Sequence, residues 1–286
     1  MRPQIQAFFD EATFTVTYLV ADPVTRTAAI IDPVLDYDPK SGRTSTKSAD
    51  DVLAAAKRGD LRVDWILETH AHADHLSAGS YLRGKSAAKI VIGEHIATVQ
   101  QTFKPVFNVD SQTTDGTDFD RLVKDDDSLK LGNLDIEVLC TPGHTPACVS
   151  YKIDDAVFVG DTLFMPDYGT ARADFPGGDA RTLYRSIKRI LSLPPETRLF
   201  MCHDYKAPGR ETYAWETTVG EERAKNVHVR DGIGEDEFVA KRTARDKTLA
   251  MPVLILPSIQ INIRAGALPP PEANGVSYLK IPLNRL

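Results

Sequence analysis

Residues 69–75 read Thr69-His70-Ala71-His72-Ala73-Asp74-His75, so that four side chains able to bind a metal ion lie within six residues. On a helix, residues two apart diverge by about 200°, whereas in an extended chain they face the same way. The end of a strand is therefore the geometry that lets His70 and His72 converge. The apolar residues Trp65-Ile66-Leu67 just before them predict that strand, and Leu76–Arg83 predicts a helix after them.

Three more residues of ligand type occur elsewhere in the chain. His144, Asp161 and His203 each come just after a short apolar run. Loops at the ends of strands are where a rigid sheet holds catalytic groups, so separate strand ends can direct their side chains to one point. We therefore predict one metal site, built from His70, His72, Asp74, His75, His144, Asp161 and His203.

The chemistry of these side chains limits the kind of metal site. Imidazole and carboxylate ligands without thiolate suit zinc, iron or manganese. A structural zinc site normally has four ligands and favours cysteine, so seven candidates are too many for one. They indicate either two metal ions bridged by Asp161, or one metal ion with an open position and the remaining groups around it.

The composition is that of an ordinary globular protein, with 42% hydrophobic and 26% charged residues in a chain of 286. The formal net charge of −6 argues against broad binding to nucleic acid or to anionic membranes, because both require clustered positive charge. We expect a small-molecule partner instead.

Cysteine usage and the N-terminus bear on the cellular location. Cys140, Cys148 and Cys202 cannot all pair within the chain and have no CxxC spacing, which disfavours a disulfide framework and a cysteine zinc site. The N-terminal segment contains Asp10 and Glu11 where a signal peptide would need an unbroken apolar run, and no run reaches the roughly 18 residues of a membrane span. We therefore expect a cytoplasmic protein without a membrane segment.

The pattern of apolar residues predicts a mixed α/β chain. Short β-branched and aromatic runs predict strands over Ile5–Phe9, Thr13–Val20, Thr27–Ile31, Val63–Leu67, Ala88–Ile92, Leu134–Leu139, Val149–Ile153, Ala156–Val159 and Arg198–Met201. Apolar residues at helical spacing predict helices over Ser48–Gly59, Leu76–Arg83, Glu94–Phe103 and Ala180–Leu191. The polar stretch Leu35–Lys47 is predicted to be an exposed loop.

The composition shifts beyond about Asn226. Residues Glu235–Asp246 are helix-like with mixed charge, and an apolar tail punctuated by prolines follows them. This part is too short to bury much surface alone. We predict a single domain over residues 1–286, with a core of about 1–229 and a C-terminal extension of about 230–286 packed on it. Exposed sheet edges and the tail make a homodimer plausible.

At these residues the sequence resembles the metallo-β-lactamase superfamily. Its HxHxDH motif is matched by residues 70–75, and its later ligands are matched by His144, Asp161 and His203. The match spans roughly residues 5 to 226. The resemblance implies an αββα sandwich, an α/β (α+β) fold, with the metal site at one edge of the sheets.

Neighbouring segments narrow the resemblance. Residues 141–146 (TPGHTP), 160–164 (GDTLF) and 171–175 (ARADF) resemble the glyoxalase II and persulfide dioxygenase branch. Residues 203–205, 220–223 and 76–79 look more like persulfide dioxygenases, as does a tail without the long glutathione-binding helical domain of a glyoxalase II. Gly169-Thr170-Ala171 stands where the usual sequence is Gly-Cys-Gly, which is a departure within the thiol pocket.

The resemblance to persulfide dioxygenases implies one Fe(II) per chain, held by His70, His144 and Asp161. These are the catalytic candidates together with Tyr205, and the counterparts of His72, Asp74, His75 and His203 lie around the iron. The implied reaction oxidises glutathione persulfide with dioxygen to sulfite and glutathione.

Candidates for binding the substrate lie beyond the metal ligands. Arg172 is the first candidate for a glutathione carboxylate, because its planar guanidinium matches that group. Tyr205 and Arg223 are further candidates. His95 at the start of a helix and His228 in the polar tail are predicted to be structural or solvated.

The same ligands permit other functions. A glyoxalase II-like thioesterase or a lactonase would use Zn(II), one or two ions, to generate a hydroxide that attacks a carbonyl group. A metal-stabilised binding or sensor protein is a third, non-enzymatic alternative.

Overall fold

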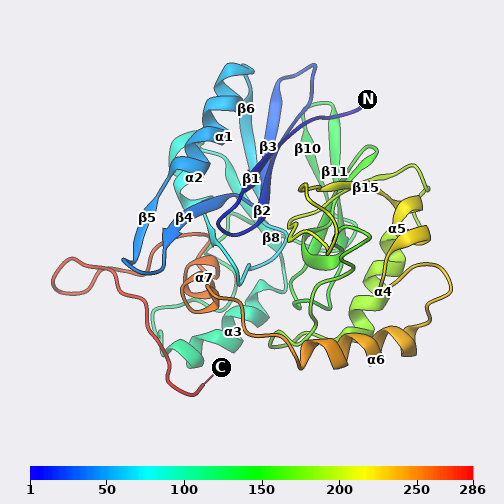
Figure 1. Cartoon of the computed structure of the whole chain (residues 1–286). Helices are drawn as coiled ribbons and strands as arrows, with labels where there is room; N and C mark the ends of the chain where they lie inside the picture. The colour runs from blue at the N-terminus through cyan, green and yellow to red at the C-terminus, as the bar shows by residue number, and fades with distance from the viewer. Residues whose placement is uncertain (286) are drawn as a thin grey trace.

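Strand β2 (Thr15–Ala21) is buried along its whole length. Val16 and Tyr18 belong to one hydrophobic cluster, whereas Leu19 and Ala21 belong to another. A strand whose two faces are both apolar lies in an inner layer of a protein. The computed structural model, which describes residues 1–285, accordingly has two facing β-sheets with helices on both outer sides (Figure 1).

The first sheet comes from the N-terminal part of the chain. Its strands lie in the order β1 (Gln4–Asp10), β2, β3 (Thr27–Ile31), β6 (Arg62–Leu67), β8 (Lys89–Gly93) and β9 (Arg121–Val123). From β3 to β9 the neighbours are parallel, so their carboxyl ends meet at one edge. The outer face packs against α1 (Lys47–Arg58), α2 (Gly79–Ser86), α3 (Ile96–Phe107) and α7 (Ile255–Asn262).

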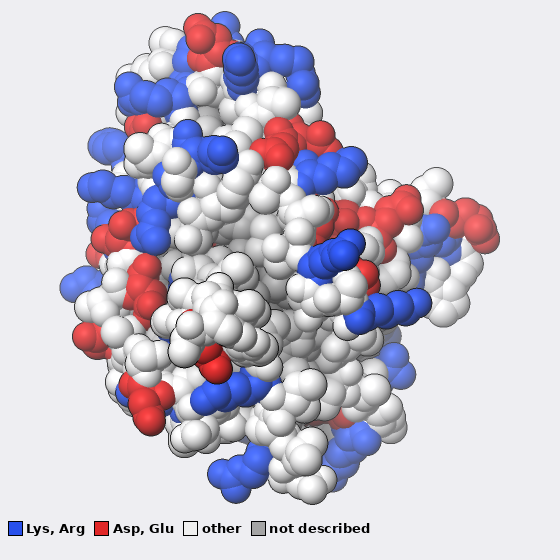
Figure 2. All heavy atoms as spheres, turned by 90° about the vertical axis from the view of Figure 1, so that its left-hand side faces the viewer, with Lys and Arg blue, Asp and Glu red and all other residues white. Residues whose placement is uncertain are grey.

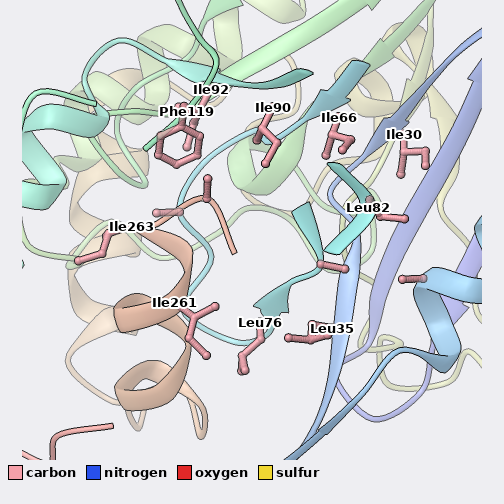
Figure 3. Close-up of a cluster of buried hydrophobic side chains, with 14 of the residues drawn as sticks. Ile30, Leu35, Ile66, Leu76, Leu82, Ile90, Ile92, Phe119, Ile261 and Ile263 are labelled. Atoms are coloured by element: carbon pink, nitrogen blue, oxygen red, sulfur yellow. The ribbon is translucent and has the colours of Figure 1, made fainter. Parts of the chain in front are cut away.

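Figure 3 shows the apolar layer between this sheet and its helices. Ile30, Ile66 and Ile90 project from three adjacent strands, and they share a buried cluster with Leu82 of α2 and Ile261 of α7. Burying one large aliphatic side chain contributes about 1.5 to 3 kcal/mol. This apolar layer therefore stabilises the packing of α7, which belongs to the C-terminal extension, on the first sheet.

The second sheet follows in the chain. Its strands lie in the order β10 (Ser128–Leu131), β11 (Leu134–Cys140), β12 (Val149–Ile153), β13 (Ala156–Phe158), β14 (Arg198–Phe200) and β15 (Glu216–Thr218). All neighbours are antiparallel except β13 and β14. Its outer face packs against α4 (Ala180–Ile190), α5 (Val219–Lys225) and α6 (Glu235–Asp246). The predicted αββα sandwich is therefore confirmed.

Aromatic side chains join the two sheets. The ring of Tyr18 meets Phe158 and Phe200 edge-on, with ring centroids 5.1 and 5.6 Å apart, and its hydroxyl donates to the carbonyl oxygen of Met201 at 2.6 Å. The amide of Val16 donates to the carbonyl oxygen of Cys202 at 2.7 Å. These contacts bring the end of β14 next to the start of β2.

The predicted loop Leu35–Lys47 is wrong over most of its length. β4 (Val34–Asp38) and β5 (Arg43–Ser45) form a hairpin there, and β4 also pairs with β7 (Leu76–Ser77). The side chains of β5 are exposed and polar, so the composition of this strand cannot be distinguished from that of a loop.

The helix predicted over Leu76–Arg83 begins later, at Gly79, because Leu76 and Ser77 pair with β4 instead. The sequence patterns also do not indicate β9, β10, β15, α5 or α7. Helix α7 contains Pro257, which normally argues against a helix but is tolerated in the first turn. The remaining predicted strands and helices are present, with their ends shifted by a few residues.

The surface carries mixed charge. On the face drawn in Figure 2, lysine and arginine side chains alternate with aspartate and glutamate. Within residues 1–285 no helix combines the length and the apolar character that crossing a bilayer requires.

Candidate metal centre

The loop that follows β6 carries the first group of predicted ligands. The rings of His70, His72 and His75 lie close together, with ring centroids 3.9 Å apart for His70 and His72 and 4.1 Å for His72 and His75. All three rings are buried. The loop follows directly on β6, as predicted, although residues 70–75 are themselves outside the strand.

His144, Asp161 and His203 reach the same place from the second sheet, after β11, β13 and β14. The Nε2 atom of His144 lies 3.6 Å from Oδ2 of Asp161, and Nε2 of His203 lies 3.3 Å from Oδ1. The Nε2 atom of His70 is 3.8 Å from Oδ2 of Asp161. The predicted convergence of separate strand ends is therefore present in the structure.

Among the described residues, four sets of ligand-type side chains have atoms within 4.8 Å of one another, and two of these sets, here called the two groups, consist only of predicted ligands. One group comprises His70, His144 and Asp161, and the other comprises His72, Asp74, His75 and His203. Asp161 lies between the groups, because its Oδ2 faces His70 and His144 while its Oδ1 faces His203. This arrangement has room for one ion in the first group, or for two ions with Asp161 between them.

Several buried atoms of the two groups have no hydrogen-bond partner among residues 1–285. These atoms are His70 Nε2, His72 Nδ1 and Nε2, Asp74 Oδ2, His75 Nε2, Asp161 Oδ1 and His203 Nε2. A buried polar atom without a partner costs about 1 to 3 kcal/mol. Metal binding would explain why so many buried atoms without partners lie in one place. Imidazole and carboxylate donors fit that role.

Burial and local charge set the protonation of these groups. Burial lowers the pKa of His70 and His72 well below the usual value, which keeps both rings in the neutral form that binds metal. Burial alone would raise the pKa of Asp74, but the nearby His203 and His75 lower it instead. For His203, burial alone would lower the pKa, but the negative charges of Asp74 and Asp161 outweigh burial and raise it.

Contacts behind the ligands fix their orientation. The carboxylate of Asp32 accepts a hydrogen bond from the amide of Thr69 at 2.7 Å. Its Oδ1 lies 3.1 Å from Nε2 of His72, a close approach that lacks the geometry of a hydrogen bond. The Nδ1 atom of His144 lies 2.8 Å from the carbonyl oxygen of Arg172, to which it can donate its proton. This contact leaves Nε2 of His144 free to bind metal.

Gly143 shapes the segment that carries His144. Its φ of +133° is one that residues with a side chain rarely adopt. A Cβ atom at this position would lie 2.3 Å from the backbone nitrogen of Leu183 in α4. Only glycine therefore lets the segment pass this close to α4 and deliver His144 to the site.

A cavity of about 790 Å³ opens onto the metal groups. Asp74, His144 and Asp161 line it, and its aromatic lining residues are Phe14, Tyr37, Phe164, Tyr168 and Tyr205. The C-terminal extension supplies another part of the wall, with Arg242, Arg245 and most of residues 249–254. The extension thus belongs to the site, which its composition does not indicate.

The arginines of the cavity differ in how they are paired. Arg172 lines the cavity as expected for a substrate-binding residue, but its guanidinium already contacts Asp174 through two nitrogens and donates to the carbonyl oxygen of Ala250 at 2.7 Å. Arg242 is buried against Asp246. Arg245, by contrast, is exposed and has no side-chain hydrogen bond or ion pair within residues 1–285.

Tyr205 and Arg223 occupy different places. The ring of Tyr205 stacks on that of His203, with centroids 5.6 Å apart and an interplanar angle of 18°. Burial raises the pKa of Tyr205 well above its usual value, so its hydroxyl keeps its proton. Arg223 is not among the residues that line the cavity, and it forms a surface ion pair with Asp231.

His228 lines the cavity, although its position in a polar segment does not suggest a role. Its Nδ1 accepts a hydrogen bond from the amide of Thr170 at 3.1 Å, and burial lowers its pKa to about 4, which keeps the ring neutral. A Cβ atom on Gly169 would lie 2.2 Å from that Nδ1. The contact joins residues 58 apart in the sequence, so local spacing gives no signal for it.

Residues 11–203 match the family described as the metallo-beta-lactamase superfamily, and they include all the predicted metal ligands. The chain belongs to the metallo-β-lactamase superfamily. Membership accounts for the four-layer sandwich and for the HxHxDH loop after β6. The chain is accordingly a metal-dependent enzyme of this superfamily, with a His and Asp cluster that fits its metal site.

Individual members of the superfamily differ in their described activity. A probable metallo-hydrolase of Burkholderia pseudomallei is 56% identical over 99% of each chain. The mitochondrial persulfide dioxygenase ETHE1 of Homo sapiens is 29% identical over 93% of this chain and 90% of its own. The crystal structure of ETHE1 from Myxococcus xanthus has a TM-score of 0.73 and 32% identity, and the match covers 92% of this chain and 100% of that one. These similarities support the predicted persulfide dioxygenase and glyoxalase II-like branch.

Proposed function

We propose that this chain is a non-haem iron(II) dioxygenase that oxidises glutathione persulfide to sulfite and glutathione. The observation that carries the proposal is the group of His70, His144 and Asp161, two imidazoles and one carboxylate within 4.8 Å of one another. This donor set is typical of non-haem iron oxygenases, in which it leaves positions open for substrate and dioxygen. The similarity to two ETHE1 proteins supports the same activity.

The proposed reaction is balanced by one water molecule. Glutathione persulfide, dioxygen and water give glutathione, sulfite and two protons, so the outer sulfur is oxidised and dioxygen is reduced. Iron, when bound, would bring the persulfide sulfur and dioxygen together and accept charge from the sulfur. His70, His144 and Asp161 would hold it.

The protein must also remove protons and limit the access of water. Asp74 lines the cavity, and its Oδ2 lies 3.3 Å from Nε2 of His203. In the one-iron arrangement neither atom binds metal, so the two side chains can take up a proton released near the iron. Phe164, Tyr168 and Tyr205 pack against one another at the cavity wall. Their rings reduce the space for bulk water beside the reacting sulfur.

The polar end of the substrate needs a cation that is not already paired. Arg172 is occupied by Asp174, whereas Arg245 lines the same cavity without a partner among the described residues. An arginine without a competing carboxylate binds a ligand carboxylate more strongly, because nothing has to be displaced. We therefore assign a glutathione carboxylate to Arg245, with Arg172 shaping the wall beside it.

A zinc hydrolase is the second candidate function. The group of His72, Asp74, His75 and His203 has enough donors for a second metal ion, and Asp161 lies between the two groups. Two ions so placed can generate a nucleophilic hydroxide. The 56% identity to a probable metallo-hydrolase supports this candidate.

One experiment distinguishes the two functions. The protein is purified without oxygen, its metals are counted, and it is assayed for oxygen uptake with glutathione persulfide and for hydrolysis of S-lactoylglutathione. We expect about one iron per chain with oxygen uptake, since one complete group of three ligands suffices. Two zinc ions per chain with thioester hydrolysis would refute the dioxygenase proposal.

A further inference from the structure

Arg264 is a buried arginine without a partner. It lies just after α7, its exposed fraction is 8%, and its guanidinium makes no hydrogen bond or ion pair with any of residues 1–285. Burial lowers its pKa from the usual value. Its nitrogens are not among the fully buried atoms that lack a hydrogen-bond partner, so the guanidinium reaches the cavity that Arg264 lines, where a ligand can contact it.

Arg264 lines a cavity that is separate from the metal centre. Its volume is about 310 Å³, and it shares no lining residue with the 790 Å³ cavity. Three segments enclose it, namely residues 108–111 after α3, the end of α7, and the tail over 269–280. The tail is held on α7 by Gln260, whose side chain accepts from the amide of Lys280 at 2.8 Å and donates to the carbonyl oxygen of Lys280 at 2.9 Å. This volume is at the lower end of the range for small-molecule sites.

The charges around the cavity define the ligand. Lys280 also lines it, but its ammonium already donates to the carbonyl oxygen of Asn108 at 2.5 Å. Asp110 and Glu272 line it too, and no side-chain ion pair occupies either of them within residues 1–285. Two carboxylates repel a doubly charged phosphate, whereas they attract an ammonium group.

We propose that this cavity binds a small zwitterion of the amino-acid class, with its carboxylate on Arg264 and its ammonium group near Asp110 and Glu272. The planar guanidinium offers two parallel donors to a carboxylate. The bound carboxylate supplies the acceptor that Arg264 lacks. The proposal does not depend on the reaction at the metal centre.

The position of Arg264 suggests a consequence for the metal loop. Asn262, two residues earlier, is hydrogen-bonded to the carbonyl oxygens of His72 and His75. A ligand that holds the end of α7 therefore acts on the segment that supports these histidines. We expect bound amino acid to slow the loss of metal to a chelator.

The test uses the full-length, metal-loaded protein, with glycine, acetate and inorganic phosphate as probes. The signal of the Arg264 Nε–H group in a ¹⁵N NMR spectrum is followed during each titration. Glycine is expected to shift it saturably and acetate more weakly, because acetate lacks the ammonium group. Arg264→Gln should weaken glycine binding about tenfold or more, as expected for the loss of charge-assisted hydrogen bonds. The exposed Arg230→Gln is the matched control and should bind glycine normally.

Two further variants keep the test informative if Arg264→Gln does not fold. Arg264→Lys retains the charge without the planar fork and should bind glycine weakly. Glu272→Gln should weaken glycine but not acetate. The proposal is overturned if glycine leaves the Arg264 signal unchanged, or if Glu272→Gln binds glycine as tightly as the parent protein does. Equal or tighter binding of phosphate would likewise reject the zwitterion.

Discussion

The side-chain amide of Asn262 donates a hydrogen bond of 2.8 Å to the carbonyl oxygen of His72, across 190 residues of sequence. The same nitrogen donates to the carbonyl oxygen of His75 at 2.8 Å, and Oδ1 accepts from the amide of Ser77 at 2.8 Å. One buried side chain of the extension thus holds two points of the metal-binding loop and the strand β7 that follows it.

Replacing Asn262 by leucine should loosen the metal centre. The substitution keeps the size but removes all three hydrogen bonds, and we expect about 2 to 4 kcal/mol less free energy of unfolding. Metal affinity should fall about 10- to 100-fold, as is usual when a group that orients ligands is lost. Competition with a chelator measures the affinity. Asn274→Leu, in the exposed tail, is the control, and equal metal loss in both variants would contradict the assignment.

The number of metal ions can be read from two alanine variants. Asp161→Ala should lose bound metal whichever group is occupied, because Asp161 lies between the groups. His75→Ala should keep about one ion per chain if only His70, His144 and Asp161 bind metal directly. Metal analysis of both proteins checks this. A fall from two ions to one in His75→Ala would support the two-metal arrangement instead.

Arg245→Ala should affect substrate binding more than turnover. The guanidinium is assigned to a carboxylate far from the reacting sulfur, so KM should rise about tenfold while kcat stays within about twofold. Steady-state oxygen uptake with glutathione persulfide measures both. Arg230→Ala removes an exposed arginine outside the cavity and should leave KM unchanged. An unchanged KM in Arg245→Ala would show that the substrate carboxylate does not bind to Arg245.

Glu222 should make stability depend on pH. It is buried in α5, and burial raises its pKa to about 8 from the model-peptide value of 4.5. The folded protein therefore binds one more proton than the unfolded chain between these two values, and the stabilisation that is complete below about pH 4.5 is lost as the pH rises toward 8. The expected slope is at most about 1.4 kcal/mol per pH unit.

Glu222→Gln removes this titration and should flatten the pH dependence relative to the parent protein. Chemical unfolding at several pH values between 5 and 8 measures the difference. The neighbouring Glu221→Gln is the control, because Glu221 is exposed and paired with Lys225. Parallel curves for the parent and Glu222→Gln would show that Glu222 is ionised in the folded state.

Local spacing predicts the metal residues well. The two-residue step from His70 to His72 excludes a helix, and a short apolar run before His144, Asp161 and His203 is visible in the chain. Both signals depend only on neighbours in sequence. They are sufficient to predict the convergence that the structure contains.

The wall of the cavity could not be predicted in the same way. Arg245 and His228 lie in polar segments, where solvated side chains are common. The place of Arg245 depends on how α6 packs on α4, and that of His228 on its contact with Thr170. The role of Asn262 is likewise not visible in the sequence, because it depends on the packing of α7 against the loop that contains His72. The pairing of Arg172 with Asp174 is a short-range contact, but only the structure shows that it competes with a ligand.

The cavity is lined both by segments of the core before residue 229 and by the C-terminal extension. Every metal ligand lies between His70 and His203, whereas Arg245 and most of residues 249–254 complete the opposite wall from the extension. The extension therefore shapes the cavity without contributing a candidate metal ligand. Substitutions within residues 242–254 can change the shape of the cavity while the candidate metal ligands remain as they are. A common metal core can in this way diversify by exchange of its terminal segment.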